Sequence, residues 1–166
     1  MHDDEFDAYK AYFIEDYAQE IMDNYGHSNL VALQMAKDAI KASFPHGITS
    51  DNEVLFAIDI TAIDTGEGVD KSAIQLNDER AQLAGYLWRI KNDTDNSCFI
   101  SDFYILPEMR SKGLGKLAIA ALERDLKEEG IQQIKLRVAY QNMRATQLYK
   151  AMGFTITGIN MSKLLC

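Results

Sequence analysis

Apolar residues in the first quarter of the chain recur at the three- and four-residue spacing of a helix buried on one side. Acidic residues fill the positions between them over residues 6–22, and Gly26 suits the place just after a helix end. Ser28 then stands where a helix N-cap is expected, before a second apolar series over residues 31–44. The pattern therefore predicts two helices, the second of which ends at Pro45-His46-Gly47.

The hydrophobic pattern changes from helix to strand at residue 54. Residues 54–60 form a short apolar run, and residues 82–90 and 98–106 have the pattern of two further strands. The turn-forming residues 91–97 join the last two, and strands joined by short turns pair antiparallel. Gly85 lies inside the second strand, where it indicates a bulge or the close approach of another backbone.

After Pro107 the pattern alternates between helix and strand. The expected elements are a helix over residues 114–126 closed by Gly130, a strand over 134–138, a short helix capped by Asn142 and closed by Gly153, and one or two strands over 154–165. The order of these elements predicts an α/β fold. We expect one domain over residues 1–166, with a mixed, mostly antiparallel central sheet flanked by helices.

Composition places the chain among compact globular proteins. It has 166 residues, of which 47 % are hydrophobic and 25 % are charged. No apolar run approaches the roughly 18 residues that a membrane span needs, which excludes an integral membrane protein. Residues 1–5 are acidic where a leader would be basic, so we expect a cytoplasmic protein. Cys98 and Cys166 are too few for a disulfide framework or a zinc site and are expected to be free thiols.

The formal net charge of −8 disfavours non-specific binding to nucleic acids, which depends on Lys and Arg facing phosphate. The charge is unevenly spread. Residues 1–60 carry 12 acidic and 3 basic residues, whereas residues 101–166 carry 6 acidic and 10 basic residues. An acidic front and a basic back favour two ligands of opposite charge, a cation and an anion. The alternative is that the charges serve solubility alone.

The loop between the third strand and the long helix has the composition of an anion site. Gly113 and Gly115 let backbone N–H groups approach a ligand without a Cβ in the way, and the helix N-terminus adds unpaired amides. Arg110, Lys112 and Lys116 place positive charge in the same segment. These residues predict a phosphate or pyrophosphate ligand, and an ordinary glycine-containing turn is the structural alternative.

Two nucleotide-binding motifs can be compared with this loop. A Walker A loop fails, because Arg110 stands where a glycine is needed and Leu117 stands where a Ser or Thr is needed. Residues 113–118 fit the dinucleotide-binding pattern with a final Ala. However, the strand that follows ends in Val138-Ala139-Tyr140, without an acid to hold a ribose hydroxyl. Dinucleotide binding therefore stays a competing hypothesis.

Two sequence blocks resemble a known family. Arg110-x-x-Gly113-x-Gly115, preceded by Ile105-Leu106-Pro107, resembles the pyrophosphate loop of the GNAT superfamily of N-acetyltransferases. The second signature block of that superfamily resembles Asn142-x-x-Ala145-x-x-Leu148-Tyr149-x-x-x-Gly153-Phe154, and the two blocks cover residues 98–157. The ending Met161-Ser162-Lys163 is similar to that of a bacterial subgroup, the YycN-like acetyltransferases. The front half matches only in architecture, as two helices followed by strands.

The resemblance implies acetyl-CoA as a co-substrate, and no metal is expected. In the family, the strand before the loop splays from its neighbour, and the pantetheine arm of the cofactor pairs with its exposed backbone. One N–H of residues 103–105 is then expected to polarise the thioester carbonyl, an oxyanion-type role. The cofactor-binding residues that the resemblance implies are Phe103, Tyr104, Ile105, Arg110, Ser111, Lys112, Gly113, Leu114, Gly115, Lys116 and Asn142.

Tyr149 is the general acid that the resemblance implies. A phenol has a reference pKa of about 10 and is protonated at neutral pH, so it can give a proton to the departing CoA thiolate. Tyr149 follows Asn142 by two helical turns and lies on the same helix face. The structural alternatives are a tyrosine that packs beside Leu148 and an Asn142 that only caps its helix.

The general base is the least determined part of the predicted site. A primary amine is mostly an ammonium at neutral pH and must lose a proton before it attacks. Asp102 lies in the splayed strand, but its side chain alternates with that of Phe103, so only one of the two faces the substrate unless a bulge intervenes. Asp59, Glu53 and a chain of water molecules are the alternatives.

The predicted activity is transfer of an acetyl group from acetyl-CoA to a primary amine by direct attack in a ternary complex. No nucleophilic cysteine is needed, and the alternative is a CoA-binding module without catalysis. We expect a small-molecule or peptide amine, held by the front helices and the loop over residues 64–80, and neither a nucleic acid nor a membrane partner. His27 and His46 are expected at the surface. An exposed edge strand would permit a homodimer.

Overall fold

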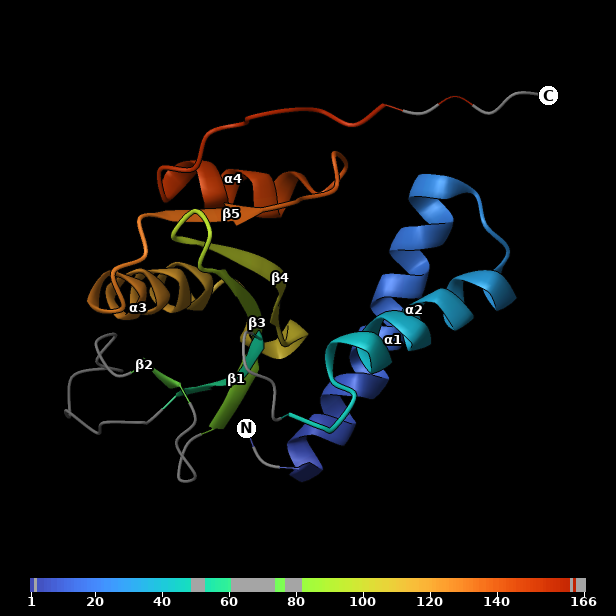
Figure 1. The fold of residues 1–166 in the computed structure, drawn as a ribbon, viewed down its shortest axis with the longest axis horizontal. Helices are drawn as coiled ribbons and strands as arrows, with labels where there is room; N and C mark the ends of the chain where they lie inside the picture. Colours follow the sequence, from blue (N-terminus) through green and yellow to red (C-terminus); the bar gives the residue numbers. More distant parts are fainter. Residues whose placement is uncertain (2, 49–52, 61–73, 77–81, 162, 164–166) are drawn as a thin grey trace. The chain divides into compact units, whose positions relative to one another are not determined.

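The computed structural model describes residues 1, 3–48, 53–60, 74–76, 82–161 and 163. Figure 1 shows their helices and strands, coloured along the sequence. The chain divides into two compact units, of which the first contains Met1–Phe6 and His46–Arg137 and the second contains Asp7–Pro45 and Val138–Cys166. A single domain over residues 1–166 therefore stays a prediction. None of the helices in the described part of the chain is long and apolar enough to cross a membrane.

The described residues of the first unit form the strands β1 (Glu53–Ile60), β2 (Ile74–Leu76), β3 (Gln82–Asn92), β4 (Ser97–Ile105) and β5 (Gln133–Leu136). They form one sheet in the order β2-β1-β3-β4-β5. β1 pairs antiparallel with β2 and β3, and β3 pairs antiparallel with β4. Among the described strand pairs, only β4 and β5 are parallel. The mixed, mostly antiparallel sheet expected from the sequence is therefore confirmed.

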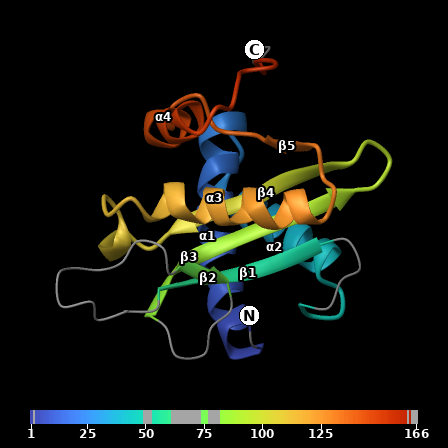
Figure 2. The same ribbon diagram turned by 90° about the vertical axis from the view of Figure 1, so that its left-hand side faces the viewer.

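The 3-10 helix η1 (Pro107–Met109) and the helix α3 (Leu114–Glu128) follow β4. α3 lies against one face of the sheet (Figure 2), which we call the α3 face. Arg89 of β3 belongs to this face, because its guanidinium reaches Glu129 at the end of α3. The buried residues of α3 match the predicted helical stripe and are Leu114, Ala118, Ile119, Ala121, Leu122 and Leu126.

Two β-bulges interrupt the ladders of β3. The ladder between β1 and β3 shifts register at Ala84, an extra residue in β3. The ladder between β3 and β4 shifts between Trp88 and Arg89, where Ser101 of β4 is the extra residue. A bulge of this kind changes the face to which the following side chains point. The sequence indicated a bulge or a close backbone approach at Gly85. The bulge lies one residue earlier, at Ala84, and the close approach is confirmed, since the backbone of Tyr104 lies against Gly85.

The second unit contains α2 (Asn29–Ser43) and, from Asp7 onward, α1 (Asp3–Tyr25). Both predicted helices are thus confirmed. Gly26 follows α1 with a φ of 68°, as expected for the position after a helix end. Ser28 is the N-cap residue of α2, but its side chain makes no capping hydrogen bond. The two helices pack on one another through the buried residues Ala18, Ile21, Ala32 and Ala36.

The helix α4 (Met143–Ala151) also lies in the second unit and confirms the predicted short helix. The prediction of one or two strands over residues 154–165 is wrong for the residues that the structure describes. Residues 154–161 and 163 belong to no strand, and Ile156, Ile159 and Met161 are exposed. A strand needs a neighbour for its N–H and C=O groups, and no described residue forms a ladder with this segment.

Candidate active site

Over residues 101–105, one edge of β4 has no paired strand among the residues that the structure describes, and we call it the uncovered edge. β3 pairs with β4 as far as Ile105, whereas β5 pairs only with Ser97–Ile100. β5 ends at Leu136, so it does not pair with residues 101–105 on the edge that lies away from β3. The backbone of residues 103–105, which the family resemblance assigns to the pantetheine arm, lies along this edge.

The hydrogen bonds at the end of β4 show which backbone groups face the uncovered edge. Leu106 N donates to Ala84 O at 2.8 Å, so this N–H points toward β3. Because backbone groups alternate in direction along a strand, the N–H groups of Phe103 and Ile105 point the other way. The carbonyl of Ile105 agrees with this direction, since it accepts a hydrogen bond from Arg110 Nε at 2.9 Å.

The loop after β4 presents N–H groups at the start of α3. Ser111 and Gly113 have φ values of 64° and 82°, in the left-handed region. The carbonyl of Gly113 accepts from Lys116 N at 3.1 Å, which begins the helix. The N–H groups of Leu114 and Gly115 lie in the first turn, where no carbonyl of the helix can accept from them. Such N–H groups, together with the positive end of the helix dipole, favour an anion.

Three cations of this loop have no carboxylate partner in the described part of the chain. Arg110, Lys112 and Lys116 are exposed, and none of them forms an ion pair with a described residue. The guanidinium carbon of Arg110 lies 5.2 Å from the ring centroid of Tyr104. Lys112 Nζ lies 3.5 Å from the sulfur of Met109. The loop therefore carries positive charge that the described residues do not neutralise.

The bulge in β4 determines the face on which Asp102 lies. Before the bulge, Ile100 stands opposite Arg89, on the α3 face. After it, Asp102 stands opposite Trp88, which alternates with Arg89 along β3. Since opposite residues of an antiparallel pair share a face, Asp102 lies on the face away from α3, and Phe103 lies on the α3 face. Without the extra residue, Asp102 would share the face of Ile100.

The three carboxylates considered as general base share this second face. Glu53 and Asp59 lie an even number of positions apart on β1, so their side chains point to one side of the sheet. Glu53 Oε2 accepts from Trp88 Nε1 at 2.9 Å, which places both on the face of Asp102. Asp59 is buried, with 4 % of its surface exposed. The structure brings the three carboxylates to one face and does not single out one of them.

Tyr86 lies on the same face and is suited to donate a hydrogen bond. Burial raises the pKa of Tyr86, and the charges of Glu5, Tyr104 and Asp59 raise it further. A phenol with a raised pKa stays protonated at neutral pH and does not act as a base. The alternation of Tyr86 with Trp88 in the sequence shows that they share a face, but only the pairing of β3 with β1 and β4 shows which carboxylates lie beside them.

Asn142 and Tyr149 belong to α4 in the second unit. Asn142 Oδ1 accepts from Ala145 N at 3.0 Å, which confirms its predicted role as N-cap. Tyr149 is buried, and its ring meets that of Phe154 edge-on, with 5.5 Å between the centroids. Contact of Asn142 with the cofactor and proton donation by Tyr149 stay predictions.

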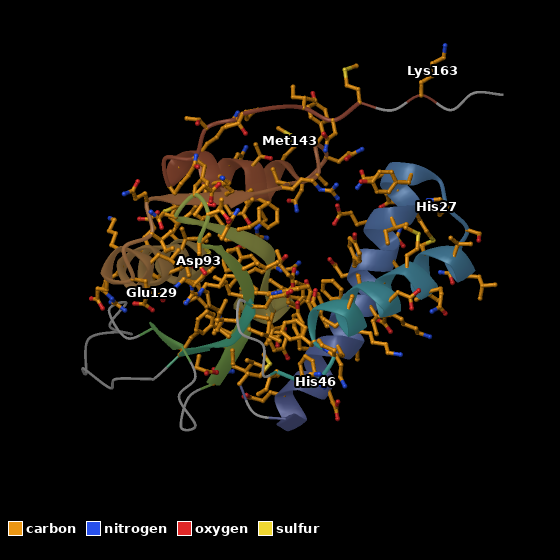
Figure 3. All side chains as sticks on the ribbon, in the orientation of Figure 1. His27, His46, Asp93, Glu129, Met143 and Lys163 are labelled. Carbon is orange, nitrogen blue, oxygen red and sulfur yellow. The ribbon has the colours of Figure 1, made fainter. Side chains whose placement is uncertain are left out.

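The described part of the chain also contains two histidines, at the surface, and one cysteine, in the interior. His27 and His46, labelled in Figure 3, are both exposed, as expected. Cys98 is a buried free thiol. Burial raises the pKa of Cys98 against the opposing effect of Arg89, so the thiolate is disfavoured.

Two predicted features lie outside the described residues, wholly or in part. Cys166 is one of them, and the proposed acceptor loop over residues 64–80 is described only at 74–76. Among the residues whose side chains are described, no cluster of His, Cys, Asp and Glu could hold a metal ion.

Comparison with known proteins identifies the family of the chain. The Acetyltransferase (GNAT) family matches residues 33–154. The uncharacterized N-acetyltransferase YdgE of Bacillus subtilis is 24 % identical over 168 residues, which cover 100 % of this chain and 96 % of YdgE. YycN of the same organism, also an uncharacterized N-acetyltransferase, is 27 % identical over 167 residues, which cover 99 % of this chain and 96 % of YycN.

The fold agrees with that of a solved relative. The crystal structure of YycN from Bacillus subtilis matches this structure with a TM-score of 0.81 at 27 % identity, and the match covers 100 % of this chain and 96 % of YycN. The similarity to YycN expected from residues 161–163 thus extends over the whole chain. With the family match, the uncovered edge of β4 and the glycine loop before α3, the chain belongs to the GNAT family of acetyltransferases.

Proposed function

We propose that this protein transfers an acetyl group from acetyl-CoA to a primary amine by direct attack in a ternary complex. The observation that carries the proposal is the uncovered edge of β4, which leads directly into the anion-binding loop before α3. Five residues of extended backbone, 101–105, span about 16 Å. An edge of this length, ending at N–H groups and cations, suits a ligand that has a diphosphate at one end and an amide-bearing arm at the other.

The phosphates are assigned to the loop. The N–H groups of Leu114 and Gly115 at the start of α3 would donate to a phosphate, and Ser111 and Gly113, with left-handed φ values, form the turn before them. Charge comes from the cations without carboxylate partners among the described residues, which are Arg110, Lys112 and Lys116.

The pantetheine arm is assigned to the uncovered edge of β4. Ile105 is closer to the loop than Phe103, and the thioester is the part of acetyl-CoA farthest along the arm from the diphosphate. We therefore assign the Ile105 N–H to an amide of the arm and the Phe103 N–H to the thioester carbonyl. A fixed N–H donor at this oxygen stabilises the negative charge that develops during attack.

The chemical step needs a base and an acid. The amine loses a proton to a base, its lone pair forms the new C–N bond, and the C–S bond breaks with its electron pair on sulfur. Tyr149 then gives the thiolate a proton, and Asn142 contacts the cofactor, as the family motif implies. Asp102 is the proposed base because it lies in the strand that binds the arm, with Asp59, Glu53 or a water chain as alternatives.

The acceptor is proposed to be a cationic amine of a small molecule or a peptide. The acidic excess of residues 1–60 supports a cationic acceptor, and Glu53 and Asp59 of that segment share the face of Asp102. Among relatives with shorter matches, the Thialysine N-epsilon-acetyltransferase of Bos taurus is 36 % identical over 55 residues, 33 % of this chain. Polyamines, amino sugars, lysine and peptide N-termini therefore form the panel of candidate acceptors.

The test is release of CoA thiol with this panel of amines, in wild type and in Tyr149→Phe. Loss of the phenol proton should lower kcat by about 10²–10⁴-fold, with the affinity for acetyl-CoA retained. Tyr140→Phe is the matched control, because Tyr140 is an exposed tyrosine in the same unit. Absence of thiol release with every amine, with acetyl-CoA still bound, would mean a binding module without catalysis. Thermal stabilisation by NAD and none by acetyl-CoA would instead favour dinucleotide binding.

A further inference from the structure

The two peptide groups on either side of Ile105 are each held in one orientation. In the first group the carbonyl of Tyr104 is directed at β3, where it lies against Gly85. In the second group the N–H of Leu106 donates to Ala84 O at 2.8 Å. The carbonyl of this second group, Ile105 O, accepts from Arg110 Nε at 2.9 Å. Both peptide groups thus contact β3, and the second one also accepts a hydrogen bond from the loop.

These contacts determine where the Ile105 N–H points. The C=O and N–H of a trans peptide point in opposite directions. Because the Tyr104 carbonyl points to β3, the N–H of Ile105 in the same peptide group points to the uncovered edge. The Ile105 carbonyl points to that edge as well, and there Arg110 satisfies it. The N–H of Ile105 is left as the group that this peptide offers to a ligand.

Gly85 is required for the first of these contacts. A Cβ at this position would collide with the carbonyl oxygen of Tyr104, and it would lie 3.0 Å from the Cα of Ile105. Both neighbours are backbone atoms of β4, which cannot move aside as the end of a flexible side chain can. Any residue larger than glycine would therefore displace the end of β4 or rotate the Tyr104 peptide.

Arg110 connects the loop to the same strand. Its Nε–H is used by Ile105 O, and its guanidinium lies over the Tyr104 ring. The two terminal nitrogens of the guanidinium form no hydrogen bond with a described residue and can donate to an anion. A single side chain is therefore placed to hold the end of β4 and to bind a phosphate at the same time. A lysine would keep the charge but would lose the fork of donors.

We infer that Gly85 and Arg110 are positioning residues, which together hold the Ile105 N–H at the uncovered edge for the pantetheine arm of acetyl-CoA. This inference rests on the proposed acetyl transfer from acetyl-CoA. It adds to that proposal a role for Gly85, a residue of β3 that would not touch the ligand. It also gives Arg110 a second role, holding the end of β4, besides the binding of phosphate.

The test compares two ligands by calorimetric titration of the full chain. Acetyl-CoA has both the diphosphate and the arm, whereas ADP has the diphosphate alone. Gly85→Ala should weaken acetyl-CoA binding by about threefold to tenfold, the value of one hydrogen bond, and leave ADP binding unchanged. Arg110→Lys also loses the fork of phosphate donors, so it should weaken the binding of both ligands, and it should weaken acetyl-CoA binding by about threefold to tenfold more than ADP binding. Because both residues act through Ile105, the double variant should be weakened by less than the product of the two single effects.

Two control variants separate positioning from general destabilisation. Ile119→Val removes one methylene from a buried position of α3, outside β3, β4 and the loop, and it should lower the melting temperature without changing either affinity. Arg124→Lys makes the same exchange as Arg110→Lys at an exposed arginine whose one bonded partner among the described side chains is its neighbour Asp125. It should leave both affinities as they are.

The titrations distinguish failure of the positioning role from failure of the proposed acetyl transfer. Equal weakening of ADP and acetyl-CoA, or no weakening of either, would overturn the positioning role while acetyl transfer by the wild type still stood. A wild type that does not bind acetyl-CoA would overturn the proposed function and this inference with it. If Gly85→Ala does not fold, Arg110→Lys decides alone, because its side chain is exposed in a loop.

Discussion

Replacement of Glu129 by Gln should destabilise the first unit by removing the counter-charge of Arg89. The carboxylate of Glu129 accepts from Arg89 Nη2 at 2.7 Å and from Arg89 Nη1 at 3.3 Å, and it lies 2.8 Å from Lys91 Nζ. The Arg89 side chain is 8 % exposed, and its Nε has no hydrogen-bond partner among the described residues. One carboxylate at the end of α3 therefore compensates two cations of β3.

The expected loss follows from the burial of the two partners. Removing one partner of a fully buried ion pair costs about 3–5 kcal/mol. Glu129 is 31 % exposed, so water reaches its side chain, and a Gln can still accept one hydrogen bond from Arg89. We therefore expect Glu129→Gln to lower the free energy of unfolding by about 1.5–3 kcal/mol.

Urea denaturation at neutral pH measures this loss. Glu128→Gln is the matched control, because Glu128 is the neighbouring exposed acid and forms no ion pair with a described residue. A loss below about 0.5 kcal/mol for Glu129→Gln, as is usual for surface pairs, would refute the role of a buried counter-charge. An equal loss in Glu128→Gln would do the same.

The pH dependence of stability gives a second measurement of the same contact. Burial raises the pKa of Glu129, but hydrogen bonds and charge from Lys91 and Arg89 outweigh it and hold the pKa below the usual range. A lowered folded-state pKa contributes stability above the unfolded value of about 4.3, and this stability is lost as the pH falls through the folded pKa. The difference between wild type and Glu129→Gln should therefore shrink below about pH 4, and a constant difference would contradict the assignment.

Three further predictions concern the bulge, the cap and the buried thiol. Deletion of Ser101 would remove the bulge and turn the Asp102 side chain to the α3 face, so the rate of thiol release should fall by about tenfold or more. An unchanged rate would exclude Asp102 as the base. Asn142→Ala should cost about 1 kcal/mol in urea denaturation because Ala145 N loses its acceptor, and Asn142→Asp should retain most of the stability. Cys98 should react with a thiol reagent only on unfolding, because it is buried with a raised pKa, and fast labelling of the folded protein would contradict its burial.

The helices could be predicted from the sequence because their hydrogen bonds lie within a single segment. The apolar stripe of α3, counted at three- and four-residue spacing from Leu114, is the stripe that is buried in the structure. Asn142 was predicted as an N-cap from its residue type and place, and its side chain accepts from Ala145 N. Ser28 was predicted on the same ground but forms no cap bond, since residue type does not determine the rotamer.

The features that depend on pairing between distant segments could not be predicted. β2 has three residues, too few to show a period, and it exists through its ladder with β1. The bulge at Ser101 leaves no mark in the sequence, yet it decides the face of Asp102. Residues 154–165 have a strand-like composition, but composition does not supply a neighbouring strand. The sequence of a strand thus shows that its side chains alternate between two faces. Only the pairing with other strands shows which face each side chain occupies and which residues lie beside it.

The ion pairs of the structure show which charges of the basic half serve the fold and which are left for a ligand. Part of the basic excess of residues 101–166 serves structure, because Lys135 pairs with Asp95 on the turn before β4. Arg110, Lys112 and Lys116 have no such partner in the described part of the chain, and they lie together at the start of α3. Charges that served solubility alone would have no reason to gather beside unpaired helix N–H groups. The position of the uncompensated cations, rather than their number, therefore favours an anionic ligand at this loop.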